Sequence, residues 1–321
     1  MIKRIGVLTS GGDAPGMNAA VRSVVRCAIA RGYEVYGIHD GFKGMYEGQN
    51  IERLYRKSVS EKMGRGGTFI GTGRLPEFDQ VEVRKKAIEN IKMYGIDALV
   101  CIGGNGTYHG ALELSKMGIP TVAIPGTIDN DISGTDFTIG FDTALNTAVE
   151  AVDKLRDTSS SHRRCSVVEV MGRDCGDLAM WTAIAVGAEC VICKETGYDL
   201  QEILDNINKA AKSKNHAIII VAEHMIDVNE LAKVVTEKTP FGARTTVLGY
   251  IQRGGNPTAK DRVLASEMGV KAISALVDDD LTGVCVAQQG HDIVTMPIED
   301  ALNGDDVSPV LEKYKVFKML W

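Results

Sequence analysis

The sequence predicts an α/β fold with mostly parallel β-strands and helices on both faces of the sheet. Short apolar runs alternate with longer stretches in which apolar residues recur at helical spacing. Most apolar runs end in a segment rich in glycine and polar residues. The length of 321 residues, with 44% hydrophobic and 24% charged residues, is typical of a globular chain of about two domains.

The expected elements follow in order along the chain. Residues 5–8, 34–38, 98–102, 121–124, 166–170, 217–222 and 245–248 are short apolar runs and are predicted to be strands. Helices are predicted at residues 17–30, 107–116, 141–156, 199–213 and 258–277. In the first of them Met17, Val21, Val24 and Ala28 fall on one face, and Pro15 suits the first turn. Ligands of open α/β sheets bind at the carboxyl ends of the strands. The segments that follow the strands are therefore the candidate site.

Charge and cysteine content exclude several classes of protein. The net charge of −6 argues against nucleic-acid binding, since such domains are usually strongly basic. No apolar run approaches the roughly 20 residues of a membrane span, and a Gly-Gly pair follows the N-terminus too early for a signal peptide. We expect a cytoplasmic protein with reduced cysteines, no membrane contact and no nucleic-acid partner. Cys190 and Cys193 form a C-x-x-C without a second pair. We therefore interpret them as buried strand residues and not as zinc ligands.

Two glycine-rich loops are candidate phosphate sites. Residues 9–18 and 103–107 each join a strand to a helix, and such a junction surrounds an anion with backbone N–H groups. Neither loop reads G-x-G-x-x-G or G-x-x-x-x-G-K-[ST], which argues against a Rossmann dinucleotide fingerprint and a Walker-type NTPase. Thr107 is expected to donate its hydroxyl to a phosphate. A tight structural turn remains an alternative for both loops.

The loop at residues 125–131 carries two carboxylates, Asp129 and Asp131, beside a hydroxyl and an amide. One carboxylate can take a proton from an attacking alcohol, and the other can hold a metal ion or orient the first. The alternative is a local Asx-turn network.

Several arginines flank predicted strands and indicate an anionic substrate, because guanidinium groups bind phosphate in pairs of hydrogen bonds. These are Arg164, Arg173, Arg244 and Arg253, with Arg74 as a further candidate. Arg22 and Arg26 lie four residues apart on one helix face. From spacing alone, that face is interpreted as exposed and without special function.

Taken together, these motifs resemble the bacterial 6-phosphofructokinase family along nearly the whole chain. The matching segments, in order, are residues 5–18, 65–68, 125–131, 157–162, 170–173, 222–224 and 247–255. The resemblance implies a glycolytic kinase that transfers the γ-phosphoryl group of MgATP to the 1-hydroxyl of fructose 6-phosphate. It also implies a homotetramer in which a neighbouring subunit completes each active site, and an allosteric site for ADP or phosphoenolpyruvate.

The resemblance further implies roles for individual residues. Asp129 would be the base, Thr127 and Asp131 would organise the phosphoryl group and its Mg²⁺, and Arg173 would stabilise the transition state. ATP would be held by Gly12, Arg74, Leu75, Gly104, Asn105, Gly106 and Thr107. The sugar phosphate would be held by Thr127, Ile128, Asp129, Met171, Gly172, Arg173, Glu223, Tyr250 and Arg253, and by Arg164 and Arg244 from the adjacent subunit. The effector would be held by Arg22, Arg26, Arg56, Arg156, Glu189, Lys212, Lys214 and His216.

The same resemblance implies two Rossmann-like, three-layer lobes with the active site in the cleft between them. The ATP-binding lobe would comprise residues 1–139 and 252–305. The sugar-phosphate-binding lobe would comprise residues 140–251 and 306–321, and the chain would cross between the lobes more than once.

Four positions bear on how this chain differs within that family. Family members that use pyrophosphate carry Asp in place of Gly106 and Lys in place of Gly126, so the two glycines favour ATP. Asn105 stands where the family has a magnesium-binding Asp, and Tyr250 stands where it has His. The alternatives are a paralogue of low activity that acts as a regulatory or binding subunit, and a kinase with another sugar phosphate or phosphoryl donor.

Overall fold

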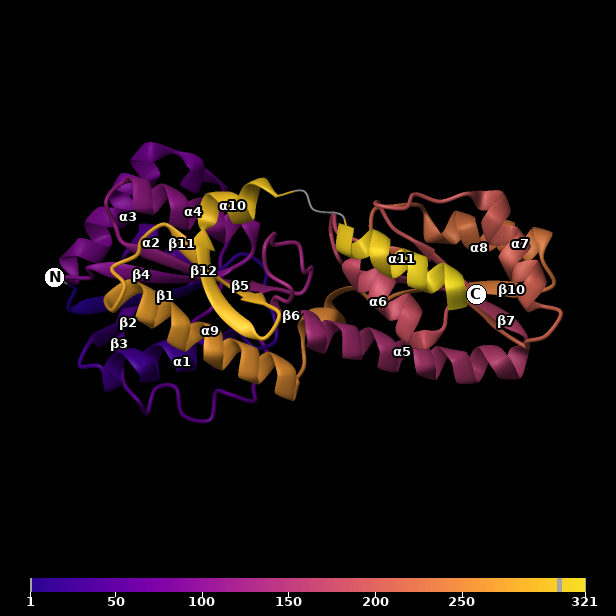
Figure 1. The fold of residues 1–321 in the computed structure, drawn as a ribbon, viewed down its shortest axis with the longest axis horizontal. Helices are drawn as coiled ribbons and strands as arrows, with labels where there is room; N and C mark the ends of the chain where they lie inside the picture. Colours follow the sequence, from indigo (N-terminus) through magenta and orange to yellow (C-terminus); the bar gives the residue numbers. More distant parts are fainter. Residues whose placement is uncertain (1, 305–307, 321) are drawn as a thin grey trace. The chain divides into compact units, whose positions relative to one another are not determined.

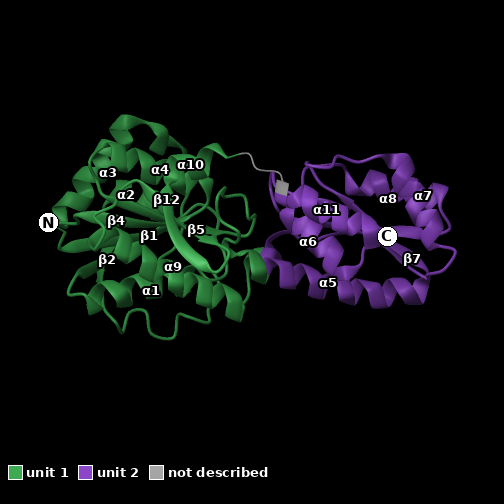
Figure 2. Cartoon of the chain, in the orientation of Figure 1, with its two compact units in different colours: residues 1–143, 253–305 green, residues 144–252, 306–321 purple. Residues whose placement is uncertain are grey.

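The computed structural model describes residues 2–304 and 308–320. The chain divides into two compact units, residues 1–143 with 253–305 (unit 1) and residues 144–252 with 306–321 (unit 2) (Figure 2). The boundary predicted between residues 305 and 306 lies outside the described residues. Within the described part of the chain, no helix is both long enough and apolar enough to cross a membrane.

Unit 1 is built on a sheet with strand order β12-β11-β5-β4-β1-β2-β3, and β6 pairs with β5 (Figure 1). The pairings are parallel except β2–β3 and β11–β12. The strands are β1 (Arg4–Ser10), β2 (Glu34–Ile38), β3 (Ile51–Leu54), β4 (Ala98–Gly103), β5 (Thr121–Thr127), β6 (Ile139–Gly140), β11 (Val284–Gln289) and β12 (Asp292–Pro297). The predicted α/β fold with mostly parallel strands is confirmed.

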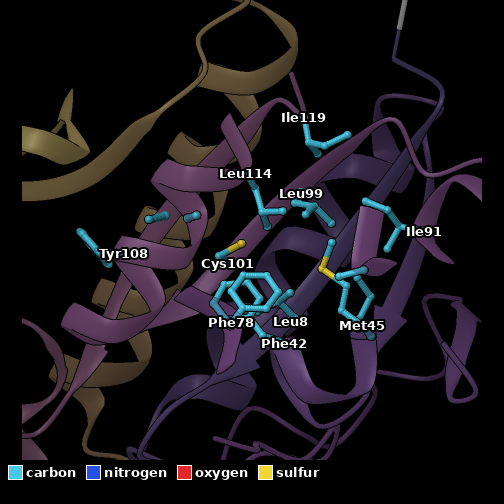
Figure 3. Packing of buried hydrophobic residues seen from close by; sticks show 14 of the residues in the cluster. Leu8, Phe42, Met45, Phe78, Ile91, Leu99, Cys101, Tyr108, Leu114 and Ile119 are labelled. Carbon is cyan, nitrogen blue, oxygen red and sulfur yellow. The ribbon is translucent and has the colours of Figure 1, made fainter. Parts of the chain in front are cut away.

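Helices cover both faces of this sheet, because alternate residues of its strands are apolar on either side. Leu99 and Cys101 of β4 face one side, where Phe42 and Phe78 stack with ring centroids 4.2 Å apart (Figure 3). That side carries α2 (Gly41–Glu47), η1 (Pro76–Asp79), α3 (Val81–Met93), α4 (Asn105–Lys116) and α10 (Ile298–Asn303). Two further helices, α1 (Met17–Ala30) and α9 (Ala259–Val277), pack against each other and against the strands.

Unit 2 has a fully parallel sheet with strand order β10-β7-β9-β8. Ile218 and Ile220 of β9 face one apolar cluster, and Ile219 and Val221 face another, so this unit also has three layers. The strands are β7 (Arg164–Val170), β8 (Cys190–Ile192), β9 (Ala217–Ala222) and β10 (Gly242–Val247). The first cluster includes residues of α5 (Phe141–His162), α6 (Asp177–Val186) and α11 (Ser308–Leu320), and the second includes residues of α7 (Leu200–Ala210) and α8 (Val228–Lys238).

The structure corrects several predicted limits. Strand β5 continues to Thr127 although Pro125 cannot donate to a ladder. The pairing with β11 has already ended at Ala123, so no hydrogen bond on that side is lost. Helix α4 begins at Asn105, two residues before the predicted start. Arg164 opens β7 and Arg244 lies within β10, so neither is in a flanking loop as expected.

Candidate active site

Three loops of unit 1 begin at the same level of the sheet. The register places Ser10 of β1 beside Gly103 of β4, and Gly103 beside Pro125 of β5. The two glycine-rich loops and the carboxylate loop therefore lie next to one another at the carboxyl edge of the strands. This is the edge at which an open α/β sheet binds its ligand.

The segment that carries Arg74 is fastened to the first of these loops. Thr9 Oγ1 donates to the carbonyl of Gly71 at 2.7 Å, and Thr72 Oγ1 donates to the carbonyl of Gly11 at 2.8 Å. These bonds bring Arg74 to the end of β1, with its side chain exposed and that of Leu75 half-buried. Arg74 can therefore meet an anion at this edge.

Gly12 makes room for a second arginine. An added Cβ at Gly12 would lie 3.4 Å from Cζ of Arg253, so the guanidinium group rests directly over the glycine. Arg253 ends the turn η2 (Gly249–Arg253). The first glycine-rich loop thus combines backbone N–H groups with a guanidinium group, both of which suit a phosphate.

The second glycine-rich loop is the N-terminus of α4, which concentrates backbone N–H groups and the positive end of the helix dipole. Thr107 donates its hydroxyl to the carbonyl of Ser10 at 3.0 Å, and is 2% exposed. The expectation that this hydroxyl donates to a phosphate differs from the geometry, because its hydrogen joins the two loops. Gly106 faces open space, with nothing within 4 Å of an added Cβ.

Asn105 and Asp131 are paired. The amide Nδ2 of Asn105 donates to Oδ2 of Asp131 at 2.8 Å, so the first residue of α4 is joined to the carboxylate loop. Both side chains are half-buried. Among the described residues, no group of three or more His, Cys, Asp or Glu side chains is placed to hold a metal ion.

The carboxylate loop is held in shape by its own polar groups. Thr127 Oγ1 accepts from the backbone N–H of Asp129 at 3.2 Å. Asn130 has a φ of 54°, and its Oδ1 accepts from the N–H of Thr138 at 2.9 Å. Thr127 thus closes a short turn on Asp129, and Asn130 joins the loop to Thr138, so the segment that carries Asp129 and Asp131 is held at both ends. Ile128 is 2% exposed, so its side chain belongs to the core.

Gly126 is packed more tightly than Gly106. Its added Cβ would meet Ile102 at 3.1 Å and Met17 at 3.2 Å, inside the core of unit 1. A side chain at this position would require Ile102 or Met17 to shift by a few tenths of an ångström, whereas Gly106 has open space for one.

In unit 2, the expected sugar-phosphate residues gather at the end of β7. Glu223 Oε1 accepts from the N–H of Arg173 at 2.8 Å and from the N–H of Gly172 at 3.2 Å. Gln252, fully buried, accepts from the N–H of Met171 at 3.3 Å. Arg173 is exposed and has a φ of 56°. Its backbone is therefore held in a left-handed conformation by a carboxylate.

Arg164 and Arg244 lie apart from this loop, whereas Tyr250 lies two residues before Gln252, which contacts the loop. Arg164 begins β7, seven residues before Met171, which is about 23 Å at 3.3 Å per residue. Arg244 is exposed on β10, the edge strand, and Tyr250 is 78% exposed. One copy of unit 2 thus does not bring Arg164 and Arg173 to the same ligand.

The expected effector residues form two groups, one in each unit. In unit 1, Arg22 and Arg26 are both half-buried, which corrects the interpretation of an exposed face; burial, and then the charge of Arg26, lower the pKa of Arg22. Arg56 of this unit is exposed. In unit 2, Glu189 accepts from Lys214 Nζ at 2.7 Å, and His216 Nδ1 lies 2.8 Å from Ser160 Oγ.

Arg156 and Lys212 complete the second group. Arg156 donates to the carbonyl of Val186 and contributes, with Lys214, to lowering the pKa of His216, for which burial is the larger cause. Lys212 lies just after α7. Each group is a concentration of positive charge that suits an anion.

The sequence model of the phosphofructokinase family matches residues 4–276. The chain belongs to the phosphofructokinase family. Proteins named ATP-dependent 6-phosphofructokinase from Tolumonas auensis and Aliivibrio fischeri are 54% and 56% identical to it over 322 residues, which is 100% of this chain and of each relative. The solved phosphofructokinase of Saccharomyces cerevisiae has a TM-score of 0.87 at 34% identity over 99% of this chain. This chain spans 46% of the yeast chain.

Sequence reasoning missed the residues that shape the phosphofructokinase loops without being expected to touch a ligand. Gln252 and the backbone-holding function of Glu223 are examples, because their partners lie far away in the sequence. The only sequence signal for Gln252 was its place beside Arg253 in a segment that matches the family. Cys190 and Cys193 are both buried, as predicted, and Cys190 opens β8, but the strand ends at Ile192, so Cys193 lies just beyond it.

Proposed function

We propose that this chain phosphorylates fructose 6-phosphate with ATP in glycolysis, and that the γ-phosphoryl group passes to the 1-hydroxyl of the sugar. Family membership and the names of the full-length relatives support the reaction. One observation carries the proposal: the carboxylate loop and the two glycine-rich loops lie side by side at one edge of the unit 1 sheet. Products would be fructose 1,6-bisphosphate and ADP.

Asp129 acts as the base in this proposal. Its backbone N–H is held by Thr127 and its loop is closed by Asn130, so the carboxylate has a defined position from which to accept the hydroxyl proton. General-base catalysis contributes about 10²–10⁴-fold in rate. Arg173 supplies positive charge to the phosphoryl group in transfer, while Gly12, Arg74, Leu75 and the Gly104–Thr107 loop hold ATP. Most of the catalysis is then positioning and charge neutralisation.

A magnesium ion fits this donor set only as an ion brought by the nucleotide. Asn105 and Asp131 offer one amide and one carboxylate, which suits Mg²⁺ because it commonly takes one or two carboxylates and fills its other positions with phosphate and water. Asp131 would hold the ion, with Asn105 as a weaker, uncharged partner. When bound, the ion would neutralise charge on the phosphates.

The quaternary arrangement is part of the proposal. The separation of Arg164 from Arg173 along β7, and the exposure of Arg244, support a homotetramer in which Arg164 and Arg244 reach the sugar phosphate of a neighbouring subunit. The positive groups around Arg22 with Arg26 and around Lys214 with His216 support an anionic effector such as ADP or phosphoenolpyruvate.

The experiment is identification of the product by ³¹P NMR with MgATP and fructose 6-phosphate. We expect fructose 1,6-bisphosphate from the wild type, and turnover lower by about 10²–10⁴-fold for Asp129→Asn. Asp292→Asn, which changes an exposed carboxylate of the same unit, is the matched control and keeps full turnover. A product phosphorylated elsewhere on the sugar, or full turnover by Asp129→Asn, would refute the proposal.

A further inference from the structure

The loop that carries Arg173 has no regular structure, yet side chains from other elements hold it. It runs from the end of β7 to the start of α6, through residues 171–176. Its first half is held by Gln252 and Glu223, as described above. Inside the loop, the N–H of Cys175 donates to the carbonyl of Gly172 at 2.9 Å.

Glu195 fixes the second half of the loop. Its Oε1 accepts from the backbone N–H of Gly176 at 2.8 Å. Gly176 is the N-cap of α6 and has no side chain with which to cap the helix. A Cβ there would collide with Oε2 of Glu195 and would approach the Cβ of Cys193 to 2.6 Å. The glycine and the carboxylate therefore fit closely, and Glu195 supplies the anion that a helix N-terminus favours.

Glu195 is itself carried on a rigid turn. The N–H of Gly197 donates to the carbonyl of Cys193 at 2.9 Å, and Cys193 is 0% exposed within an apolar cluster of unit 2. The neighbouring residue Lys194 places its Nζ 4.0 Å from Oδ1 of Asp174, which joins the two loops a second time at the surface. The turn after β8 thus braces the loop after β7.

We propose that Glu195 is a positioning residue for phosphoryl transfer, acting through the loop of Arg173. The inference rests on the proposed function of Arg173 as the group that stabilises the transition state. Without the carboxylate, the loop on the C-terminal side of Arg173 is released while Gln252 and Glu223 still hold the N-terminal side. Binding of the sugar phosphate near Met171 and Gly172 is then largely kept. The backbone of Arg173 is held on one side only, so its guanidinium group is placed less precisely.

The expected effect is selective for turnover. A displacement of about 1 Å at a reacting group costs up to about 10²-fold in rate, so Glu195→Ala should lower kcat by about 10- to 100-fold. The KM values of both substrates should stay within about threefold, since binding groups are retained. Glu195→Gln keeps an oxygen acceptor for the N–H of Gly176 and should restore kcat to within about threefold of wild type.

The matched control is Asp199→Ala. Asp199 also accepts backbone N–H bonds at a helix N-terminus of unit 2, from Gln201 and Glu202, but it lies outside the Arg173 loop. This variant should lose stability without losing kcat. Amide hydrogen exchange of residues 171–176 should accelerate in Glu195→Ala and stay unchanged in Asp199→Ala.

A double-mutant cycle with Arg173→Ala gives the deciding result. If Glu195 acts through Arg173, adding Glu195→Ala to that variant lowers kcat by less than about threefold. Additive losses, wild-type kcat in Glu195→Ala, or an equal loss in Asp199→Ala would overturn the proposal. If Glu195→Ala does not fold, Glu195→Asp replaces it, because the shorter side chain withdraws the acceptor from the N–H of Gly176. The same losses of kcat and of protection from hydrogen exchange are then expected. Absence of sugar-dependent turnover in the wild type would instead refute the proposed function, while hydrogen exchange would still report the brace.

Discussion

Replacement of Asn105 by Asp is expected to raise turnover and to make the stability of unit 1 depend on Mg²⁺. Asn105 Nδ2 and Asp131 Oδ2 are 2.8 Å apart. Two carboxylate oxygens at that separation repel by about 1.5 kcal/mol at the dielectric constant of water and by about 6 kcal/mol at an effective value of about 20. Because both side chains are half-buried and can move apart, we expect a cost of about 1.5–3 kcal/mol without metal.

Mg²⁺ bound with ATP should offset the repulsion between the two carboxylates. A second carboxylate ligand stabilises the ion through the transition state, and about 1.4 kcal/mol of such stabilisation is tenfold in rate. The phosphates carry most of the coordination, so a tenfold rise in kcat is the expected order of magnitude.

Two assays test this reasoning together: kcat at saturating MgATP, and thermal unfolding with and without Mg²⁺. Asn105→Ala is the control, because it removes the hydrogen bond to Asp131 without adding charge, and it should show neither gain. If Asn105→Asp leaves kcat unchanged and unfolds at the same temperature with and without Mg²⁺, the argument from magnesium charge is refuted.

Three further predictions concern donor choice, packing and pH. Gly106→Asp should leave the melting temperature unchanged, since its Cβ faces open space, and should raise the KM for ATP by about tenfold or more through repulsion of phosphate. Asp261→Ala should lower the free energy of unfolding, measured in urea, by about 3 kcal/mol, because the buried carboxylate accepts from Gly140 and Thr143. Burial lowers the pKa of His216 from its ordinary value of 6.5, so near that pH the unfolded chain binds more protons than the folded chain. The free energy of unfolding should therefore fall as the pH drops below about 6.5. His216→Asn should make this fall smaller in urea unfolding measured across that pH range.

The sequence predicted the parallel core well, because central strands are short apolar runs that end in glycine. The limits of α1 and β2 match the structure, and the ends of β1, β4 and β5 differ by a few residues. The strands β3, β11 and β12 were not predicted. β3 and β12 lie at the two edges of the sheet, and their residues are mostly exposed or half-buried, so no apolar run marks them. β11 does contain a short buried apolar run, and the prediction overlooked it.

The residues of the candidate site also differ in how far the sequence could predict them. Residues that would touch a ligand directly stand in short motifs, so Asp129, Arg173 and the glycine loops could be named from sequence. Residues that hold those motifs act over long separations, as Gln252 does at 81 residues from Met171. The function of Thr107 in joining two loops, and the close packing around Gly126, also depend on tertiary contacts that no local pattern contains.

The central claim, that the chain is a working sugar-phosphate kinase, is tested most directly by steady-state ADP release from the purified protein with MgATP, with and without fructose 6-phosphate. We predict turnover of about 1–100 per second that requires the sugar. Turnover that is absent, independent of the sugar, or a thousandfold below about 1–100 per second would contradict the account and favour a regulatory or binding paralogue.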